Sequence, residues 1–332
     1  MPAAVAALFL AGELAFRLAW FGPAALLRPW DYSAASSFER GLVEPDPDPR
    51  IVWRLVPGRR SMLKGARFTT NTAGFRGPEI AREKAPGEHR IAVVGASITV
   101  GVGVDDETPY ARQAEARLHE LGHGEVTVLN AGVQNYEASQ IVAAYETHVR
   151  AFAPDAVVVP VYPGLFPRTD VPEVGALARR DPGDLSVRRL LAPLFLTKAL
   201  RAWMQDGPGR LLASDWQERA HPVPRGADRP TFESIMDDFA TSLDADGTPL
   251  FLLLLPKADH PPRRRLVRLR EQADELAARH RGATVLDVLP EVAPRVSEAD
   301  RVYPGDRHPN ARYHALVGRA LAEALRPYLP AP

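Results

Sequence analysis

The chain contains no cysteine among its 332 residues. This absence excludes a thiol nucleophile, thiolate zinc sites, iron–sulfur clusters and disulfide bonds. An excess of charge of either sign is also lacking, because 41 Lys and Arg are balanced by 41 Asp and Glu. That balance argues against a nucleic-acid-binding surface. Covalent catalysis, if the protein performs it, must therefore use a hydroxyl, an amine or a carboxylate.

What the sequence has in quantity is proline, with 32 residues, and one long apolar run near its N-terminus. Residues 3–20 are almost all apolar and just long enough to cross a bilayer core. Glu13 and Arg17 interrupt the run at a spacing that lets them pair on one helix face. No basic region precedes the run, which disfavours a cleaved signal peptide. A signal-anchor helix, an interfacial helix and a soluble helix packed on the domain remain open; we prefer the anchor and assign residues 1–28 to it.

The rest of the chain divides into a polar approach segment and a strand–helix domain. Residues 29–84 are broken by proline and glycine, which predicts loops with short strands. Residues 85–329 alternate apolar, β-branched runs with helical patterns, which predicts a parallel sheet covered by helices on both faces. Residues 168–229 interrupt this rhythm and predict an insertion over the carboxyl edge of the sheet, where ligands bind in such folds. The predicted strands are 90–94, 126–130, 156–161, 250–255 and 284–288, and the predicted helices include 108–121, 139–152 and 311–325.

The first predicted strand of this domain leads directly into a serine. The run 90–94 ends at Gly95, and Ser97 follows two residues later at the carboxyl end of the sheet. A serine there presents its hydroxyl beside backbone N–H groups that can hold an oxyanion. The same serine could instead cap the helix that follows. The surrounding glycines lack the spacing of a dinucleotide or phosphate loop, so no cofactor is expected.

A histidine near the C-terminus lies two residues after a carboxylate. Asp306 and His308 fall in a proline-bounded loop, and alternation in an extended chain points both side chains to one side. The carboxylate could then orient the imidazole and stabilise the imidazolium formed during catalysis. Asn310 is a predicted N-cap for the last helix, and His314 inside that helix is interpreted as structural. Asp306, His308 and His314 could bind a metal, but no further ligand cluster supports such a site, so no metal is expected.

Several segments together resemble the bacterial SGNH/GDSL hydrolases, over roughly residues 65–327. NTAGFRG at 71–77 resembles a segment that precedes the family's first strand, and GASITVG at 95–101 matches the family's serine block in part. The similarity continues through VLNAGVQNYEASQ at 128–140, PDAVVVPVYPG at 154–164 and DRHPN at 306–310.

The resemblance implies a flavodoxin-like three-layer α/β sandwich with a five-stranded parallel sheet. It implies Ser97 as nucleophile, His308 as general base and acid, and Asp306 as the orienting carboxylate. The backbone N–H groups of Ser97 and Gly132 would form part of the oxyanion hole.

Two positions depart from the family pattern. Ala96 stands where the family has an aspartate before the serine, and Gly164 stands where the family has an asparagine that donates to the oxyanion. Asn135 or Gln134, which lie beside Gly132, could substitute for that donor. Loss of one oxyanion donor typically reduces turnover by roughly 10²–10³.

We therefore expect a serine esterase or acyltransferase that acts on O-acyl esters of carbohydrates or cell-envelope glycans. The N-terminal helix would hold it in a bacterial inner membrane with the domain on the extracytoplasmic side. The alternative is a catalytically weak glycan-binding or accessory protein of the same fold, which the two departures motivate. Neither reading involves nucleic acid.

Overall fold

The computed structural model describes residues 2–38, 40–162, 194–196, 231–256, 263–304 and 306–331. The predicted insertion at 168–229 therefore lies outside the described residues, except for 194–196.

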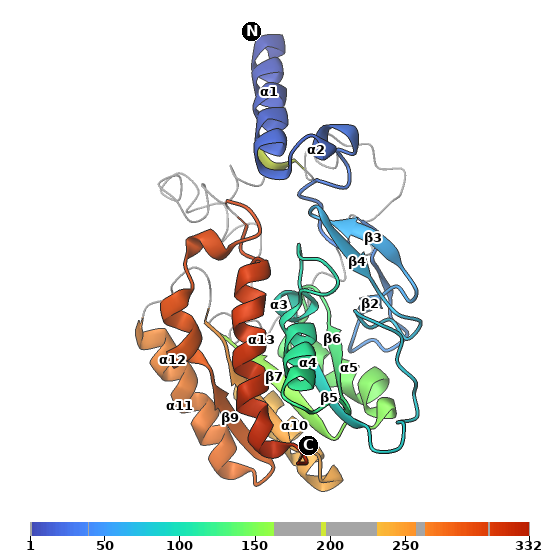
Figure 1. The fold of residues 1–332 in the computed structure, drawn as a ribbon, viewed down its shortest axis with the longest axis vertical. Coiled ribbons are helices and arrows are strands. Elements are labelled where there is room, and N and C mark those ends of the chain that lie inside the picture. The colour runs from blue at the N-terminus through green and yellow to red at the C-terminus, as the bar shows by residue number, and fades with distance from the viewer. Residues whose placement is uncertain are drawn as a thin grey trace.

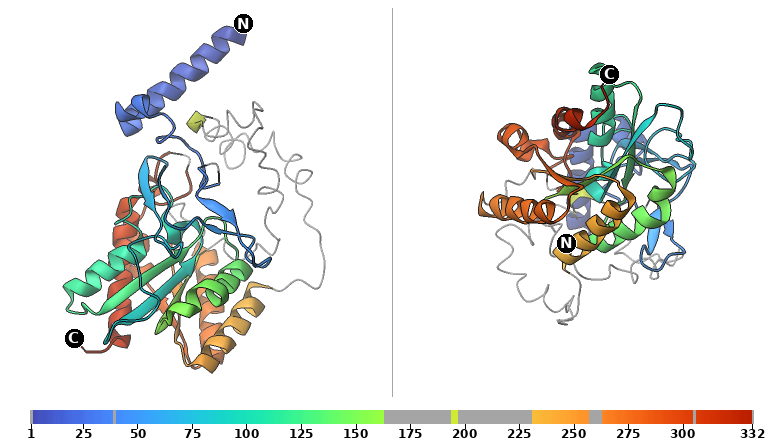
Figure 2. Two further views of the ribbon diagram at one scale, coloured as in Figure 1. Left: turned by 90° about the vertical axis from the view of Figure 1, so that its right-hand side faces the viewer. Right: turned by 90° about the horizontal axis from the view of Figure 1, so that it is seen from below.

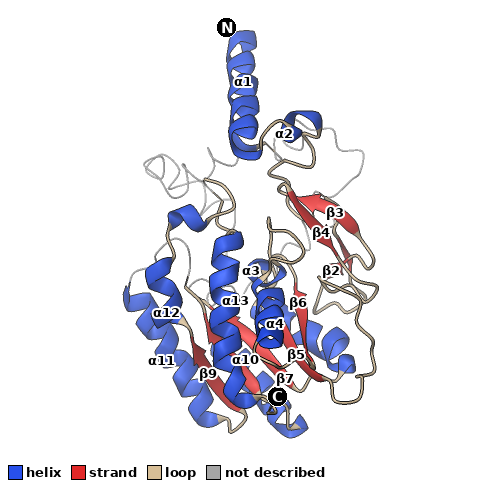
Figure 3. Cartoon of the chain, viewed as in Figure 1, coloured by secondary structure: helices blue, strands red, loops and turns tan. Residues whose placement is uncertain are grey.

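A five-stranded parallel sheet forms the centre of the molecule (Figures 1 and 3). Its strands are β5 (His89–Gly95), β6 (Val126–Gly132), β7 (Ala156–Val161), β8 (Leu250–Leu254) and β9 (Ala283–Asp287). In space they follow the order β6-β5-β7-β8-β9, which is the flavodoxin-like order. Nearly every residue of β5, β7 and β8 is buried, as expected for strands covered on both faces. The predicted α/β fold class and all five predicted strands are confirmed.

Helices cover both faces of this sheet (Figure 2). On one face, α4 (Tyr110–Glu120) packs along α13 (Ala311–Leu325). On the other face, α5 (Ala138–Ala144) contacts α10 (Phe232–Asp246), and α10 contacts α11 (Arg263–Arg279). The described part of the domain also contains two one-turn α-helices, α3 (Ser97–Val100) and α12 (Leu289–Val292), and 3₁₀ turns at Ala293–Arg295, Glu298–Asp300 and Arg326–Tyr328. The predicted helix 139–152 runs on from α5 through a π-helical turn at Tyr145–Val149 and a short 3₁₀ turn at Arg150–Phe152.

The approach segment forms two antiparallel hairpins that join the domain. Its strands are β1 (Val43–Pro45), β2 (Trp53–Leu55), β3 (Arg60–Leu63) and β4 (Ala66–Thr69). Trp53 and Phe68 are buried in the same apolar core as the central sheet. The Trp53 indole N–H donates to the Gln134 carbonyl at 3.2 Å, and the Tyr136 hydroxyl donates to the Trp53 carbonyl at 2.5 Å. These contacts fasten the first hairpin beside the carboxyl end of β6.

The N-terminal helix α1 (Pro2–Phe21) projects from the domain and is followed by the short α2 (Ala24–Leu27) (Figure 1). Its stretch Ala4–Phe21 is long and apolar enough to cross a membrane, and Leu8, Leu14 and Leu18 are exposed on it. The predicted Glu13–Arg17 pair is confirmed, with Arg17 Nε 2.7 Å from Glu13 Oε1. The Glu13 carboxylate also accepts backbone N–H groups from residues 195 and 196 at 3.2 and 3.0 Å. Protein groups therefore satisfy this charged pair.

Candidate active site

Ser97 is placed by the junction between β5 and α3. Strand β5 ends at Gly95, Ala96 occupies the N-cap position, and Ser97 is the first residue of α3. Gly101 ends this single turn in the left-handed region, with φ 75°. The Ser97 side chain is half-buried, and its backbone N–H lies in the first turn, where α-helical N–H groups have no intrahelical acceptor.

Two glycines at the ends of adjacent strands let α3 approach the sheet closely. Gly95 of β5 and Gly132 of β6 are partners in register. A Cβ on Gly132 would lie 2.8 Å from the carbonyl carbon of Thr99, and one on Gly95 would lie 3.0 Å from the ring of Pro160. Both glycines therefore have a packing role in positioning Ser97.

Asn130, which the sequence analysis did not single out, closes the gap between β6 and α3. It is buried, and its Nδ2 donates to the Thr99 carbonyl at 2.8 Å. Its Oδ1 accepts the backbone N–H of Gly132 at 3.1 Å. The N–H predicted to help form the oxyanion hole is thus engaged by a side chain in this structure. The signal in the sequence was a polar residue near the end of an otherwise apolar strand.

The loop that carries Asp306 and His308 is folded by its own hydrogen bonds. Val302 N donates to the His308 carbonyl at 3.0 Å, and the His308 backbone N donates to Asp306 Oδ1 at 2.7 Å. The same Oδ1 lies 2.6 Å from His308 Nδ1. Asn310 caps α13, as predicted, by accepting the N–H of Tyr313 at 3.2 Å. Asp306 therefore contacts the ring nitrogen that an orienting carboxylate would need to contact.

Lys64 at the tip of the β3–β4 hairpin joins this pair, and no pattern in the sequence indicated that it would. Its Nζ contacts Asp306 Oδ2 and lies 3.1 Å from His308 Nδ1. Burial alone would raise the pKa of Asp306, but the Lys64 ammonium and the His308 imidazole together hold it well below its usual value. Asp306 is thus a carboxylate throughout the neutral pH range.

The serine loop and the histidine loop lie next to each other. A Cβ on Gly103, which follows α3, would lie 2.7 Å from Val302 Cγ1. Val302 in turn is hydrogen-bonded to His308 through the backbone. No hydrogen bond joins the Ser97 hydroxyl to the His308 ring, although both residues belong to the described part of the chain. Such bonds often tighten only when substrate binds.

Arg76 clamps the segment that follows Ser97, which gives the NTAGFRG motif a physical role. Its guanidinium is buried and donates to the carbonyls of Val100 at 2.6 Å and Val104 at 2.5 Å. Burial lowers the pKa of Arg76 to about 10, although Asp106 opposes the shift. Within the same motif, Asn71 Oδ1 accepts the backbone N–H of Phe75 at 2.9 Å. The motif thus holds the turn that ends α3.

The other residues predicted for the oxyanion hole lie in different environments. Asn135 is exposed and has a left-handed backbone, with φ 65°. Gln134 is buried, and its Oε1 accepts the backbone N–H of Ser37 at 3.0 Å. Gly164 lies outside the described residues.

The structure gives His314 a structural environment within α13. It is buried, and its Nδ1 accepts the backbone N–H of Tyr110 at 3.1 Å. Within the described ranges, no group of three or more His, Asp or Glu residues is arranged to hold a metal ion.

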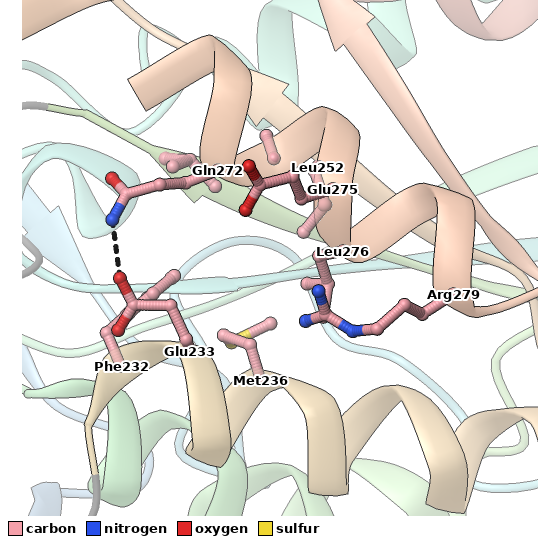
Figure 4. A pocket seen from close by; sticks show the side chains of 10 residues that line it. Phe232, Glu233, Met236, Leu252, Gln272, Glu275, Leu276 and Arg279 are labelled. Carbon is pink, nitrogen blue, oxygen red and sulfur yellow. Dashed lines mark hydrogen bonds between the residues drawn. The ribbon is translucent and has the colours of Figure 1, made fainter. Parts of the chain in front are cut away.

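A separate cavity of about 220 Å³ lies between α10 and α11 (Figure 4). Phe232, Met236 and Leu276 contribute apolar surface, and Gln272 is hydrogen-bonded to Glu233 beside them. None of the residues predicted for the site belongs to its lining.

The chain is similar at low identity to solved structures that include TesA, a lipase/acylhydrolase and an acetylxylan esterase. TesA is 16% identical, with a TM-score of 0.44 over 73% of this chain and 100% of that chain. A lipase/acylhydrolase from Enterococcus faecalis is 17% identical, with a TM-score of 0.44 over 74% and 98%. Axe2, an acetylxylan esterase from Geobacillus stearothermophilus, is 13% identical, with a TM-score of 0.42 over 71% and 94%. No protein-family model and no curated protein matches the chain. Identities this low leave residue roles to be argued from this chain's own geometry.

Proposed function

We propose that this protein is a serine esterase or acyltransferase of the SGNH/GDSL type, acting on O-acyl esters through Ser97, His308 and Asp306. The observation that carries the proposal is the Asp306–His308 pair, 2.6 Å apart, on a loop packed against the segment that follows Ser97. The motifs around Ser97 and His308 support the same family.

In the proposed reaction, the Ser97 hydroxyl attacks the acyl carbonyl while His308 Nε2 takes its proton. The Nδ1–H of His308 donates to Asp306, which stabilises the imidazolium. The Ser97 backbone N–H stabilises the oxyanion, and His308 then protonates the departing alcohol. Water or a sugar hydroxyl resolves the acyl-enzyme, giving hydrolysis or transfer. Asn135, exposed beside Gly132, is the side chain we assign as a further oxyanion donor.

The substrate we propose is an acyl ester on a carbohydrate or cell-envelope glycan. The exposed apolar face of α1 supports attachment to a membrane. We further propose that the domain lies on the extracytoplasmic side. A phosphatase fused to the C-terminus, which is active only outside the cytoplasm, tests that orientation.

Replacement of Ser97 by alanine tests the proposed chemistry. We expect the wild-type chain to react with a fluorophosphonate and to hydrolyse a short-chain ester, because the Ser97 hydroxyl attacks both. Ser97→Ala should lose the label and at least about 10³-fold of the turnover. Ser139→Ala, an exposed serine on α5, is the matched control and should behave as wild type. Equal labelling of wild type and Ser97→Ala would remove Ser97 as the nucleophile.

The second candidate function is a glycan-binding or accessory protein that uses the same site without catalysing turnover. It is favoured by the Gly132 N–H, which Asn130 engages, and by Ala96 and Gly164, which depart from the family pattern. This function predicts that an acylated glycan binds equally to wild type and Ser97→Ala, with negligible turnover of any ester.

A further inference from the structure

Lys64 is a buried cation that the proposed reaction does not use. Its side chain is 4% exposed, and its ammonium touches the carboxylate and the imidazole that form the proposed general base. Lysine is rarely buried unless it is paired. Here its partners, Asp306 and His308, are 242 and 244 residues away in the chain.

The backbone of the turn that contains Lys64 is strained. Lys64 and Gly65 form a two-residue turn between the paired residues Leu63 and Ala66, with φ 54° and 85°. Positive φ at both positions is the type I′ pattern, which favours asparagine and glycine rather than lysine. Strain of this kind persists where the surroundings hold it, and it gathers at functional sites.

The tip of this hairpin is fixed on its other side as well. Gly65 N donates to the Asp31 carbonyl at 3.0 Å. A Cβ on Gly65 would lie 2.9 Å from the Tyr32 ring and 3.1 Å from the Phe21 ring, so the turn is closely packed there. The Lys64 ammonium also lies 5.5 Å from the centre of the Tyr303 ring. The side chain of Lys64 is therefore held against the histidine loop.

The charges around His308 determine what this lysine does. In the described part of the chain, the groups that interact with His308 include Asp306 on its own loop, Lys64 on the hairpin and His314 on α13, and Arg307 is its neighbour in sequence. Of these, Arg307 is exposed and His314 is neutral, since its pKa is about 3. One carboxylate and one ammonium therefore contact the His308 ring nitrogen Nδ1. Asp306 uses Oδ1 for the imidazole and Oδ2 for Lys64.

We propose that Lys64 is a positioning residue that orients Asp306 toward His308 and, through its positive charge, keeps the imidazole unprotonated in mildly acidic solution. The inference rests on the proposed function, in which neutral His308 accepts the serine proton. An ammonium 3.1 Å from Nδ1 opposes formation of the imidazolium. The low pKa of Asp306 agrees, because the Lys64 charge contributes to it.

The test measures the protonation of His308 directly. Histidine ring signals are followed by NMR as a function of pH in the full-length chain in detergent, with His308→Gln used to assign the His308 signal. In Lys64→Met we expect the His308 titration midpoint to rise by about one pH unit, or tenfold in the proton equilibrium. Lys64→Arg keeps the charge and should titrate near the wild-type midpoint. Lys84→Met, which breaks a Lys–Asp pair at the far end of β5, is the matched control and should leave the midpoint unchanged.

A second variant covers the case in which Lys64→Met does not fold. Lys64→Asn suits the type I′ turn and also removes the charge, so the same upward shift is expected. An unchanged midpoint in a folded, charge-removing variant overturns the proposal. Because this readout needs no turnover, it is independent of the Ser97→Ala experiment. If the enzyme is active, the acid limb of its pH–rate profile should move upward with the NMR midpoint.

Discussion

At the scale of single residues, the two histidines near the C-terminus differ because their surroundings differ. His308 is partly exposed and lies between a carboxylate and an ammonium. His314 is fully buried, and its ring stacks on Tyr110 with centroids 6.0 Å apart. Burial, assisted by the Arg76 charge, lowers the pKa of His314 to about 3. His314 therefore stays neutral and links α13 to α4.

The low pKa of His314 makes the stability of the protein sensitive to acid. Between its unfolded pKa of about 6.5 and its folded pKa of about 3, the unfolded chain binds the extra proton. The free energy of unfolding should then fall by about 1.4 kcal/mol for each pH unit below 6.5 from this residue alone.

His314→Asn keeps an acceptor for the Tyr110 N–H but does not titrate. We expect it to be less stable than wild type at pH 7, since the ring packing is lost, and to lose less stability between pH 7 and 4. Thermal unfolding in detergent at a series of pH values measures both. If the stabilities of wild type and His314→Asn fell equally between pH 7 and 4, His314 would not be the source of the acid sensitivity.

At the scale of elements, the position of Ser97 depends on how α3 lies on the ends of β5 and β6. Asn130 and Arg76 bind its carbonyls from two sides, and Gly95 and Gly132 leave room beneath it. Apart from the contact of Gly95 with Thr99, these contacts join residues that are more than twenty positions apart in the sequence. The serine is therefore positioned by neighbouring elements, since one helical turn has little stability of its own.

Gly132→Ala should displace this turn. The added Cβ would collide with the backbone of Thr99 and Val100, and overpacking of this kind typically costs about 1–3 kcal/mol. We expect the Tm to fall by several degrees and fluorophosphonate labelling of Ser97 to decrease.

The control for this variant is Gly124→Ala, at a position with no heavy atom within 4 Å of the new Cβ. Its Tm and labelling should match those of wild type. Full stability of Gly132→Ala would show that α3 can shift freely.

At the scale of the whole molecule, the N-terminal helix and the histidine loop are in contact. The Trp20 indole N–H donates to the Val302 carbonyl at 3.0 Å, and the Phe16 and Tyr303 rings meet edge to face. The backbone N–H of Val302 donates a hydrogen bond to the His308 carbonyl. If α1 lies in a bilayer, the proposed site is close to the membrane surface.

Replacing Leu8 and Leu14 together by lysine tests the anchor. Both side chains are exposed on α1, and a lysine at the centre of a membrane-spanning helix costs about 3 kcal/mol. We expect the wild-type chain to stay in the membrane pellet after a carbonate wash and the double variant to move into the soluble fraction. Val267→Lys, at an exposed apolar position on α11, should fractionate as wild type. Release of the wild-type chain by the wash would rule out a spanning anchor.

Much of this structure could be predicted from local patterns. Apolar, β-branched runs predicted the five strands because both faces of a parallel sheet are buried. The i, i+4 spacing predicted the Glu13–Arg17 pair, and the two-residue spacing predicted that Asp306 would lie beside His308. Lys64 and Asn130 could not be predicted in this way. Each acts on residues from other elements, and a lysine in a turn or an asparagine at a strand end has no pattern of its own.

The sequence by itself determined the chemistry open to this protein and the framework that carries it. Without cysteine, the nucleophile must be another group, and the parallel sheet follows from apolar runs that are buried on both faces. Only the tertiary structure decided which groups surround the proposed base. Lys64, Asp306 and His308 meet because a hairpin and a loop more than two hundred residues apart pack together. Charges interact strongly once burial removes the water between them, and the fold sets the distance between these charges.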